Sequence, residues 1–208
     1  QVVALGLGLM ALLVLTLVRT DLLASWRSSL PADAPNHFLV NIQPGEVTAV
    51  GDFLRQRGLN GIELFPMVRG RLNAINGRAV GPDDYDNPRA KGLVEREFNL
   101  SWTERWQADN RIVAGRWWTA AERGQGLASV EQGLAQTLGI ALGDTLRFQV
   151  AGQSLDAKVA SLRSVEWDSF RVNFFVLFPP GLLDAYPATW ITSFHLPKDQ
   201  KPLLAELV

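Results

Sequence analysis

The chain opens with a long apolar run. Residues 2–18 contain no charged side chain, and Thr16 with two glycines interrupts a stretch made mainly of leucine, valine and alanine. A buried helix of a soluble protein normally carries a polar stripe, and this run has none over about five turns. A run of about 17 apolar residues is at the short limit for crossing a bilayer core. The pattern therefore predicts a transmembrane helix, followed by a juxtamembrane extension to residue 29. A cleaved signal peptide is the alternative, although no basic segment precedes the run.

Alternating and helical patterns follow a proline-rich connector at residues 30–36. Phe38, Val40 and Ile42 alternate with Leu39 and Asn41, a period of two that predicts a strand. Residues 45–57 repeat apolar side chains at helical spacing and end at a glycine, which predicts an amphipathic helix. A second strand is expected at residues 61–65, where Pro66 interrupts it. Residues 68–75 resume an extended pattern up to Asn76-Gly77, a strong two-residue hairpin signal, with residues 78–80 returning.

The middle of the chain is predicted to be rich in strands. Residues 81–88 form a polar loop, and a capping box of Ser129 and Gln132 predicts a short helix that ends at Gly139. Strands are expected at residues 146–150 and 155–159, joined by a polar turn.

The end of the chain predicts two more strands and a helix. Residues 172–178 read as a buried strand and residues 188–196 as another, with a helix starting near Asp199. The whole pattern indicates an α+β fold with two lobes. One lobe combines residues 30–80 and 165–208, and residues 81–164 form a β-rich lobe inserted between them.

Composition narrows the function. The 20 basic and 21 acidic residues give a net charge of −1, so no broad positive surface is available for a nucleic-acid partner. The absence of cysteine excludes disulfide scaffolds, zinc fingers, iron–sulfur sites and thiol nucleophiles. No metal or cofactor site is predicted in this chain, and no phosphate-binding loop is present for ATP.

Residues that could support catalysis lack the partners that catalysis needs. His37 and His195 belong to no metalloprotease pattern, and no nucleophile-elbow motif exists. Acidic side chains could supply paired carboxylates for hydrolysis. They lie in a proline- and glycine-rich loop and its surroundings, where acids are usually only solvated. The acidic residues concerned are Asp83, Asp84, Asp86, Glu95 and Glu97.

Aromatic residues are the other candidates. Four tryptophans, at positions 102, 106, 117 and 118, could line a surface for hydrophobic cargo, or could form the core of the inserted lobe. We favour the core, because a small lobe without disulfides needs large buried side chains. Residues 167–171 precede a strand, and a packed corner is favoured over a site there.

Four segments carry a resemblance to a known family. These are residues 36–44 (NHFLVNIQP), 112–118 (IVAGRWW), 165–181 (VEWDSFRVNFFVLFPPG) and 189–195 (TWITSFH). In them the chain resembles the periplasmic core domain of MacB/FtsX-type ABC transporter permeases, and most closely the YbbP-like branch. The long segment at residues 165–181 is the most specific of the four. The resemblance spans nearly the whole chain.

The resemblance implies a porter-like α/β subdomain interrupted by a β-rich, sabre-like subdomain on the periplasmic side of the inner membrane. It also implies a separate cytoplasmic ATP-binding cassette subunit, which would hold ATP and magnesium, and a mechanical role without a catalytic site here. The expected partners are that subunit, the lipid bilayer, and a periplasmic protein or hydrophobic cargo. A docking module that recruits a periplasmic hydrolase is the alternative. The candidate interaction or structural residues are Trp117, Trp118, Trp167, Asp168, Phe170, Arg171 and Asn173.

Overall fold

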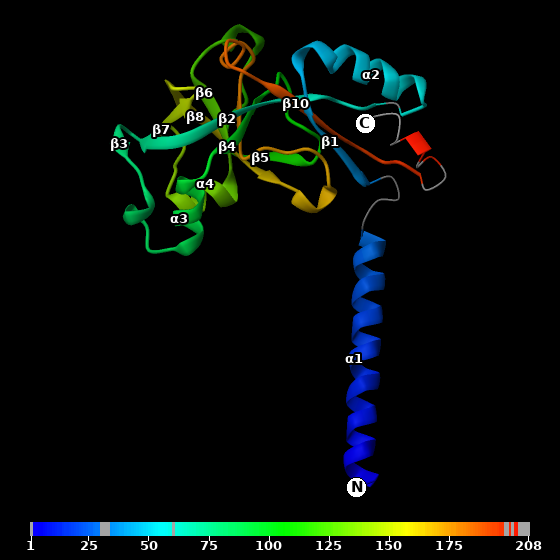
Figure 1. Cartoon of the computed structure of the whole chain (residues 1–208). Coiled ribbons are helices and arrows are strands. Elements are labelled where there is room, and N and C mark those ends of the chain that lie inside the picture. The colour runs from blue at the N-terminus through cyan, green and yellow to red at the C-terminus, as the bar shows by residue number, and fades with distance from the viewer. Residues whose placement is uncertain (1, 30–33, 60, 198–199, 201, 204–208) are drawn as a thin grey trace. The chain divides into compact units, whose positions relative to one another are not determined.

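The computed structural model describes residues 2–29, 34–59, 61–197, 200 and 202–203. The chain divides into two compact units, residues 1–34 and residues 35–208. The first unit is the helix α1 (Val2–Ser29), so the segment predicted to cross the membrane is helical and the helix is longer than the apolar run (Figure 1). Across the part of the chain that the structure describes, no helix is both long and apolar enough to cross a membrane.

The second unit begins with a small antiparallel sheet. Strand β1 (His37–Ile42) pairs with β10 (Thr189–Phe194), which pairs with the start of the long strand β2 (Phe65–Ile75). The short 3-10 turn η1 (Pro44–Glu46) leads into α2 (Val47–Gln56), which covers one face of this sheet (Figure 1). The buried side chains between helix and sheet are Leu54, Phe194, Leu196 and Leu203.

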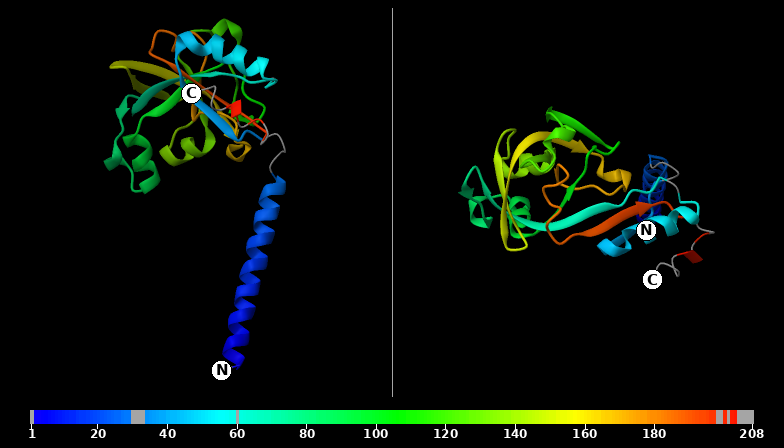
Figure 2. Two further views of the ribbon diagram at one scale, coloured as in Figure 1. Left: turned by 45° about the vertical axis from the view of Figure 1, so that its right-hand side comes forward. Right: turned by 90° about the horizontal axis from the view of Figure 1, so that it is seen from above.

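The remainder of β2 enters a closed ring of six strands. Strand β2 pairs with β4 (Phe98–Trp102), β4 with β9 (Val176–Phe178), β9 with β6 (Leu127–Glu131), and β6 with β8 (Gln153–Val165). Strand β8 pairs with β7 (Thr145–Val150), and β7 pairs with β2 again. A sheet whose last strand pairs with its first is a barrel, and its inward side chains form the core. Figure 2 shows the strands curving around this core.

Short elements complete the second unit. Helix α3 (Pro88–Glu95) and helix α4 (Gln132–Leu138) contribute Ala90, Leu93, Leu134 and Leu138 to the barrel core. Strand β3 (Arg78–Ala79) returns along β2 from the Asn76-Gly77 turn, as predicted, with φ of 52° and 78° at the two turn residues. Strand β5 (Asn110–Gly115) pairs with the far half of β8. The 3-10 turns η2 (Pro82–Asp84), η3 (Ala120–Glu122) and η4 (Trp167–Ser169) lie in the connections.

Two predicted boundaries near the start of this unit are wrong. Residues 61–64 are not a strand, and β2 runs through Pro66 instead of stopping there. Proline is tolerated because Pro66 lies opposite Trp190 of β10 on one side of β2, while the ladder with β4 on the other side starts only at Val68. The Pro66 carbonyl accepts a hydrogen bond of 2.6 Å from the buried Ser101 hydroxyl. A missing backbone donor therefore costs little here.

Three other local predictions need correction. Ser129 lies inside β6, and the N-cap of α4 is Glu131, whose carboxylate accepts hydrogen bonds from Gly133 and Leu134. Helix α3 lies where no helix was predicted, and the Asn87 side chain caps it by accepting a hydrogen bond from the Arg89 amide. Residues 172–175 are not in a strand, because only residues 176–178 find partners in the barrel.

The remaining local predictions have mixed outcomes. The predicted strands at residues 38–42, 146–150, 155–159 and 188–196 and the helix over residues 45–57 are present. Gly139 ends α4 in the left-handed conformation, as predicted. The helix expected from Asp199 lies largely outside the described residues. The division into lobes at residues 80 and 164 remains a prediction, and several strand pairings of β2 and β9 cross those boundaries.

Candidate functional site

Two of the four family-like segments meet in space. Trp118, at the end of the 112–118 segment, is 6% exposed and packs against Val172, Phe174 and Leu177 of the 165–181 segment. Partly buried side chains on β2 and β10, including Phe65 and Ile191, surround the same cluster. This cluster lies on the face of the small sheet opposite α2 and joins that sheet to the barrel.

A ladder of three indoles leads from this cluster to the surface. The rings of Trp117 and Trp118 have centroids 3.8 Å apart, and Trp106 meets Trp117 edge-on at 5.6 Å. The indole nitrogen of Trp117 donates to the Glu104 carbonyl (2.8 Å), and that of Trp118 donates to the Thr103 carbonyl (2.9 Å). Trp106 is 47% exposed. The predicted core role is confirmed for Trp118 and is wrong for Trp106, which leaves an aromatic edge at the surface.

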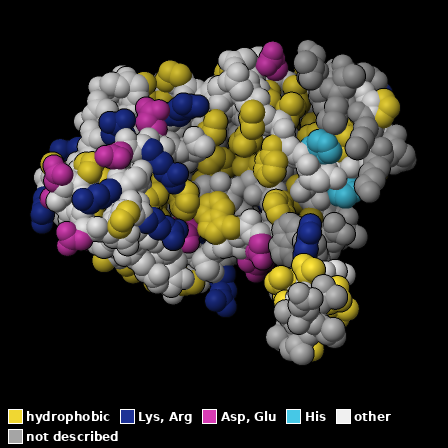
Figure 3. All heavy atoms as spheres, turned by 60° about the horizontal axis from the view of Figure 1, so that its bottom comes forward, with side chains coloured by type: hydrophobic (Ala, Val, Ile, Leu, Met, Phe, Trp, Pro, Cys, Tyr) yellow, Lys and Arg dark blue, Asp and Glu magenta, His cyan; other side chains and the backbone are white. Residues whose placement is uncertain are grey.

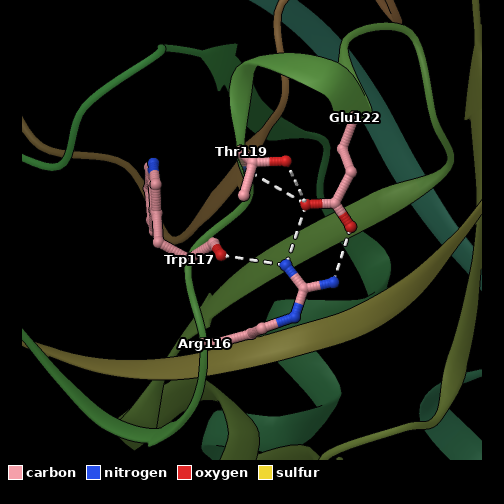
Figure 4. A network of polar contacts seen from close by, with 4 residues as sticks. All are labelled: Arg116, Trp117, Thr119 and Glu122. Atoms are coloured by element: carbon pink, nitrogen blue, oxygen red, sulfur yellow. Dashed lines mark hydrogen bonds and ion pairs between the residues drawn. The ribbon is translucent and has the colours of Figure 1, made fainter.

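A salt bridge fixes the backbone from which two of these indoles project (Figure 4). The Arg116 guanidinium donates to both Glu122 carboxylate oxygens (2.8 and 2.6 Å) and to the Trp117 carbonyl (3.1 Å). The amide and hydroxyl of Thr119 donate to the same carboxylate (2.8 and 3.1 Å). These hydrogen bonds, that from Arg116 first, lower the pKa of Glu122 to about 2. The loop is therefore tied to itself through one ionised carboxylate.

Gly115 explains why this loop can lie so close to the barrel. Its φ is +74°, and a Cβ at this position would approach the Ala160 carbonyl oxygen to 2.2 Å. The Arg116 amide donates to that same carbonyl at 3.0 Å. Only glycine combines this backbone conformation with such close contact.

A buried polar network holds the other family-like segment. One carboxylate oxygen of Asp109 accepts hydrogen bonds from the Ser169 hydroxyl (2.6 Å) and the Asn173 amide (2.7 Å). The Asn110 amide donates to the Asn173 side-chain oxygen (2.7 Å) and to Asp109 (3.1 Å). Asp109 and Asn110 are 8% and 6% exposed. This network fixes residues 169–173 against the turn that precedes β5.

A fully buried arginine extends this network into the barrel. Arg163 of β8 is 0% exposed and donates to the Asn110 side-chain oxygen (2.8 Å) and to the Phe174 carbonyl. Burial lowers the pKa of Arg163 to about 10, and the nearby charges of Glu131 and Asp109 partly oppose this shift. The Nε atom has no hydrogen-bond partner among the described residues. A buried cation with two carboxylates near it defines one arrangement of these strands.

The sequence analysis missed Asp109, Asn110 and Arg163. A signal for Arg163 was present, because it continues the inward-facing alternation of Leu155, Ala157, Val159 and Ser161 along β8. A charged residue at an inward position of a strand indicates a buried partner. No local pattern indicated which residues would supply that partner.

The predicted candidate residues divide into two groups. Trp117, Trp118 and Asn173 point into the clusters described above. Trp167 is 45% exposed and packs on Phe175 at 4.9 Å, while Phe170 is 36% exposed with φ of 57°. Asp168 and Arg171 are exposed as well.

Figure 3 shows hydrophobic side chains gathered in the middle of one face, between mixed charges and the two histidines. A role in binding for any of these residues remains a prediction.

The acidic loop is held by structural contacts. Asp84 accepts a hydrogen bond from the Gly81 amide (2.8 Å) and pairs with Arg78 at 3.1 Å. Burial, and then the charge of Asp84, raise the pKa of the neighbouring Tyr85, whose hydroxyl donates to the Leu138 carbonyl. Among the described residues, no group of three histidine, aspartate or glutamate side chains could hold a metal ion. Asp84 and Tyr85 therefore tie this loop to β3 and α4.

A comparison with known proteins identifies a related transporter permease. The chain is 41% identical over 195 residues to the uncharacterized ABC transporter permease YbbP of Escherichia coli strain K12. The match covers 94% of this chain and 23% of that protein, so the chain spans about a quarter of the length of its relative. A crystal structure of a domain of a candidate permease protein from Porphyromonas gingivalis matches 75% of this chain and 65% of that one, with 11% identity and a TM-score of 0.38. No protein-family model matches. The predicted resemblance to YbbP-like permeases is confirmed.

Proposed function

Because this chain is related over almost its whole length to a segment of an ABC transporter permease, we propose that it is the periplasmic region of a permease subunit in the inner membrane. In this proposal a separate cytoplasmic subunit hydrolyses ATP, and the domain takes part in moving a hydrophobic or lipid-linked substrate out of the membrane. The identity of 41% over 195 residues is the observation that carries the proposal.

The closed barrel of the second unit and the contacts in its connections support a role in transmitting movement. A closed barrel has no free internal edge, so a displacement applied to one strand moves its neighbours. The Asp109–Arg163 network holds the connection between β8 and β9, and the Arg116–Glu122 salt bridge holds the connection between β5 and β6. Such a body moves as a unit when one part of it is pulled.

The first unit supports an anchor in lipid. The apolar side chains described along α1 between Leu9 and Val18 are 50–66% exposed, which is unfavourable in water. The hydroxyls of Thr16 and Thr20 donate to the carbonyls four residues earlier, both at 2.7 Å. Hydroxyls in an apolar surrounding need such internal acceptors.

Copurification tests the proposal. The full-length protein, co-expressed with a candidate ATP-binding cassette subunit from the same genome, should purify as a complex in detergent and hydrolyse ATP. A variant of the ATPase that binds but cannot hydrolyse ATP is the control for background activity. A stable full-length protein that never associates with an ATPase would refute the proposal.

A docking module that recruits or activates a periplasmic hydrolase is the second candidate. The exposed aromatic side chains of Trp106, Trp167 and Phe170 favour it, since such residues dominate the energetics of protein interfaces. Replacing Trp167 and Phe170 by serine should abolish binding of a purified hydrolase and leave ATP hydrolysis by the complex unchanged. Loss of ATP hydrolysis together with binding would instead place these residues in the transport cycle.

A further inference from the structure

Strand β1 is the least firmly held strand of the small sheet. It lies at the edge, and β10 is its partner in the described structure, whereas β10 is held between β1 and β2. Its register is regular over residues 37–39 and shifts before Ile42, next to Asn41 with φ of 61°. Phe38 and Val40 point away from α2 and are 51% and 57% exposed. Besides the ladder, Leu39 packs against the cluster of Leu54 and Phe194, and Ile42 is buried at the far end of the strand, so the end at His37 has the least side-chain support.

Asn36 adds a set of hydrogen bonds at the point where the chain enters this strand. Its side-chain amide donates to the Leu196 carbonyl (3.0 Å), and its side-chain oxygen accepts from the Leu196 amide (2.8 Å). Its own backbone amide donates to the Phe194 carbonyl (3.1 Å). The side chain thus acts as an additional peptide group and extends the ladder beyond the pair of His37 and Phe194. We call these three bonds the Asn36 clasp.

Neighbouring contacts reinforce the clasp on both strands. The His37 ring stacks on Phe194 with centroids 6.0 Å apart, and its Nδ1 lies 2.6 Å from the Asn36 side-chain oxygen. Leu196 is 2% exposed in the cluster beneath α2, which also contains Leu203. The β10 side is therefore anchored in the core, and β1 is the strand that a pull would detach.

The path of the chain places the clasp where such a pull acts. Strand β1 starts and β10 ends at the same end of the sheet, because His37 pairs with Phe194 (Figure 1). Tension between α1 and the segment after Leu196 therefore separates the two strands from this end, one hydrogen bond after another. The first bonds bear the load before the others, and these are the bonds of the clasp.

We propose that the Asn36 clasp is a latch that makes the domain follow the N-terminal helix. With the latch closed, a displacement of α1 pulls on the whole sheet and barrel. With the latch open, β1 peels from β10 as far as the irregularity at Asn41, and the displacement is absorbed within the strand. The role in transport rests on the proposed function, and the peeling of β1 does not.

Hydrogen exchange on the 208-residue chain in detergent tests the latch directly. The substitution Asn36→Ala should accelerate exchange of the Leu196 amide and the β1 amides by about tenfold or more, with barrel amides unchanged. Asn36→Asp keeps the acceptor and loses one donor, so it should have an intermediate effect. Asn99→Ala, an exposed asparagine on β4, is the matched control and should change nothing near β1. Unchanged exchange in Asn36→Ala, or equal acceleration in the barrel, would overturn the latch.

An engineered disulfide separates the latch from general stability. Phe38 and Ser193 lie opposite each other on β1 and β10, and the chain contains no cysteine of its own. The double substitution Phe38→Cys and Ser193→Cys, oxidised in the Asn36→Ala background, should restore slow exchange of β1. Reduction of the disulfide should reverse this.

In the assembled transporter, Asn36→Ala should leave the rate of ATP hydrolysis unchanged. It should reduce the ATP-driven displacement of the barrel, measured by Förster resonance energy transfer. The oxidised cysteine pair should restore the displacement. Normal displacement in Asn36→Ala would overturn the role in coupling. If no ATPase partner forms a complex, the proposed function fails, while the exchange experiment still decides whether β1 is latched.

Discussion

Replacing Asp109 by alanine should destabilise the second unit more than any change of a surface acid. The carboxylate is 8% exposed and accepts hydrogen bonds from Ser169, Asn173 and Asn110. It also lies near the buried guanidinium of Arg163. Alanine leaves three donors and one buried cation without this partner.

The expected cost follows from those contacts. A hydrogen bond to a charged group contributes about 1.5–3 kcal/mol, and three such bonds are not additive because the freed Asn110 amide keeps its bond to Asn173. Removing Asp109 also takes one of two nearby carboxylate charges from the buried Arg163, which keeps Glu131. We therefore expect Asp109→Ala to lower the free energy of unfolding by about 3–5 kcal/mol, and Asp109→Asn by about half as much.

Urea unfolding followed by tryptophan fluorescence measures this difference, since the chain contains seven tryptophans. Asp156→Ala is the control, because Asp156 is 47% exposed in a surface pair with Arg147, and its midpoint should stay almost unchanged. A loss below about 1 kcal/mol for Asp109→Ala at an unchanged m value would refute the importance assigned to the network.

Three further predictions concern the loop with the indole ladder. The folded pKa of Glu122, about 2, lies below the ordinary value of 4.5, so its ionised form contributes stability above pH 4.5 that is lost as the pH falls towards 2. Glu122→Gln should therefore flatten the fall in melting temperature between pH 4.5 and 2; an unchanged slope contradicts the ionised contact. Trp118→Ala should cost about 3–5 kcal/mol in urea unfolding, and Trp106→Ala about 1 kcal/mol or less, so equal losses would argue against the buried position of Trp118. Gly115→Ala should cost about 2–4 kcal/mol, because its Cβ meets the Ala160 carbonyl, and a neutral result in the same assay would contradict that contact.

Local signals in the sequence predicted several elements correctly. The alternation at residues 38–42, the Asn76-Gly77 turn and the stop of α4 at Gly139 are all present. Each depends on the conformational preferences of a few neighbouring residues, so no distant contact is needed to find it. The two family-like segments that meet at Trp118 were also identified, although the sequence alone did not indicate that they touch.

The tertiary structure decided what depends on strand partners. Strand β2 passes through Pro66 because the ladder with β4 begins only at Val68, and residues 172–175 stay outside the sheet because only residues 176–178 find partners. Closure of the barrel joins strands far apart in the sequence, and burial of Arg163 depends on Asp109 and Asn110, more than 50 residues away. The sequence determined where local geometry is favourable; pairing energy and the need to satisfy buried polar groups decided how those pieces combine.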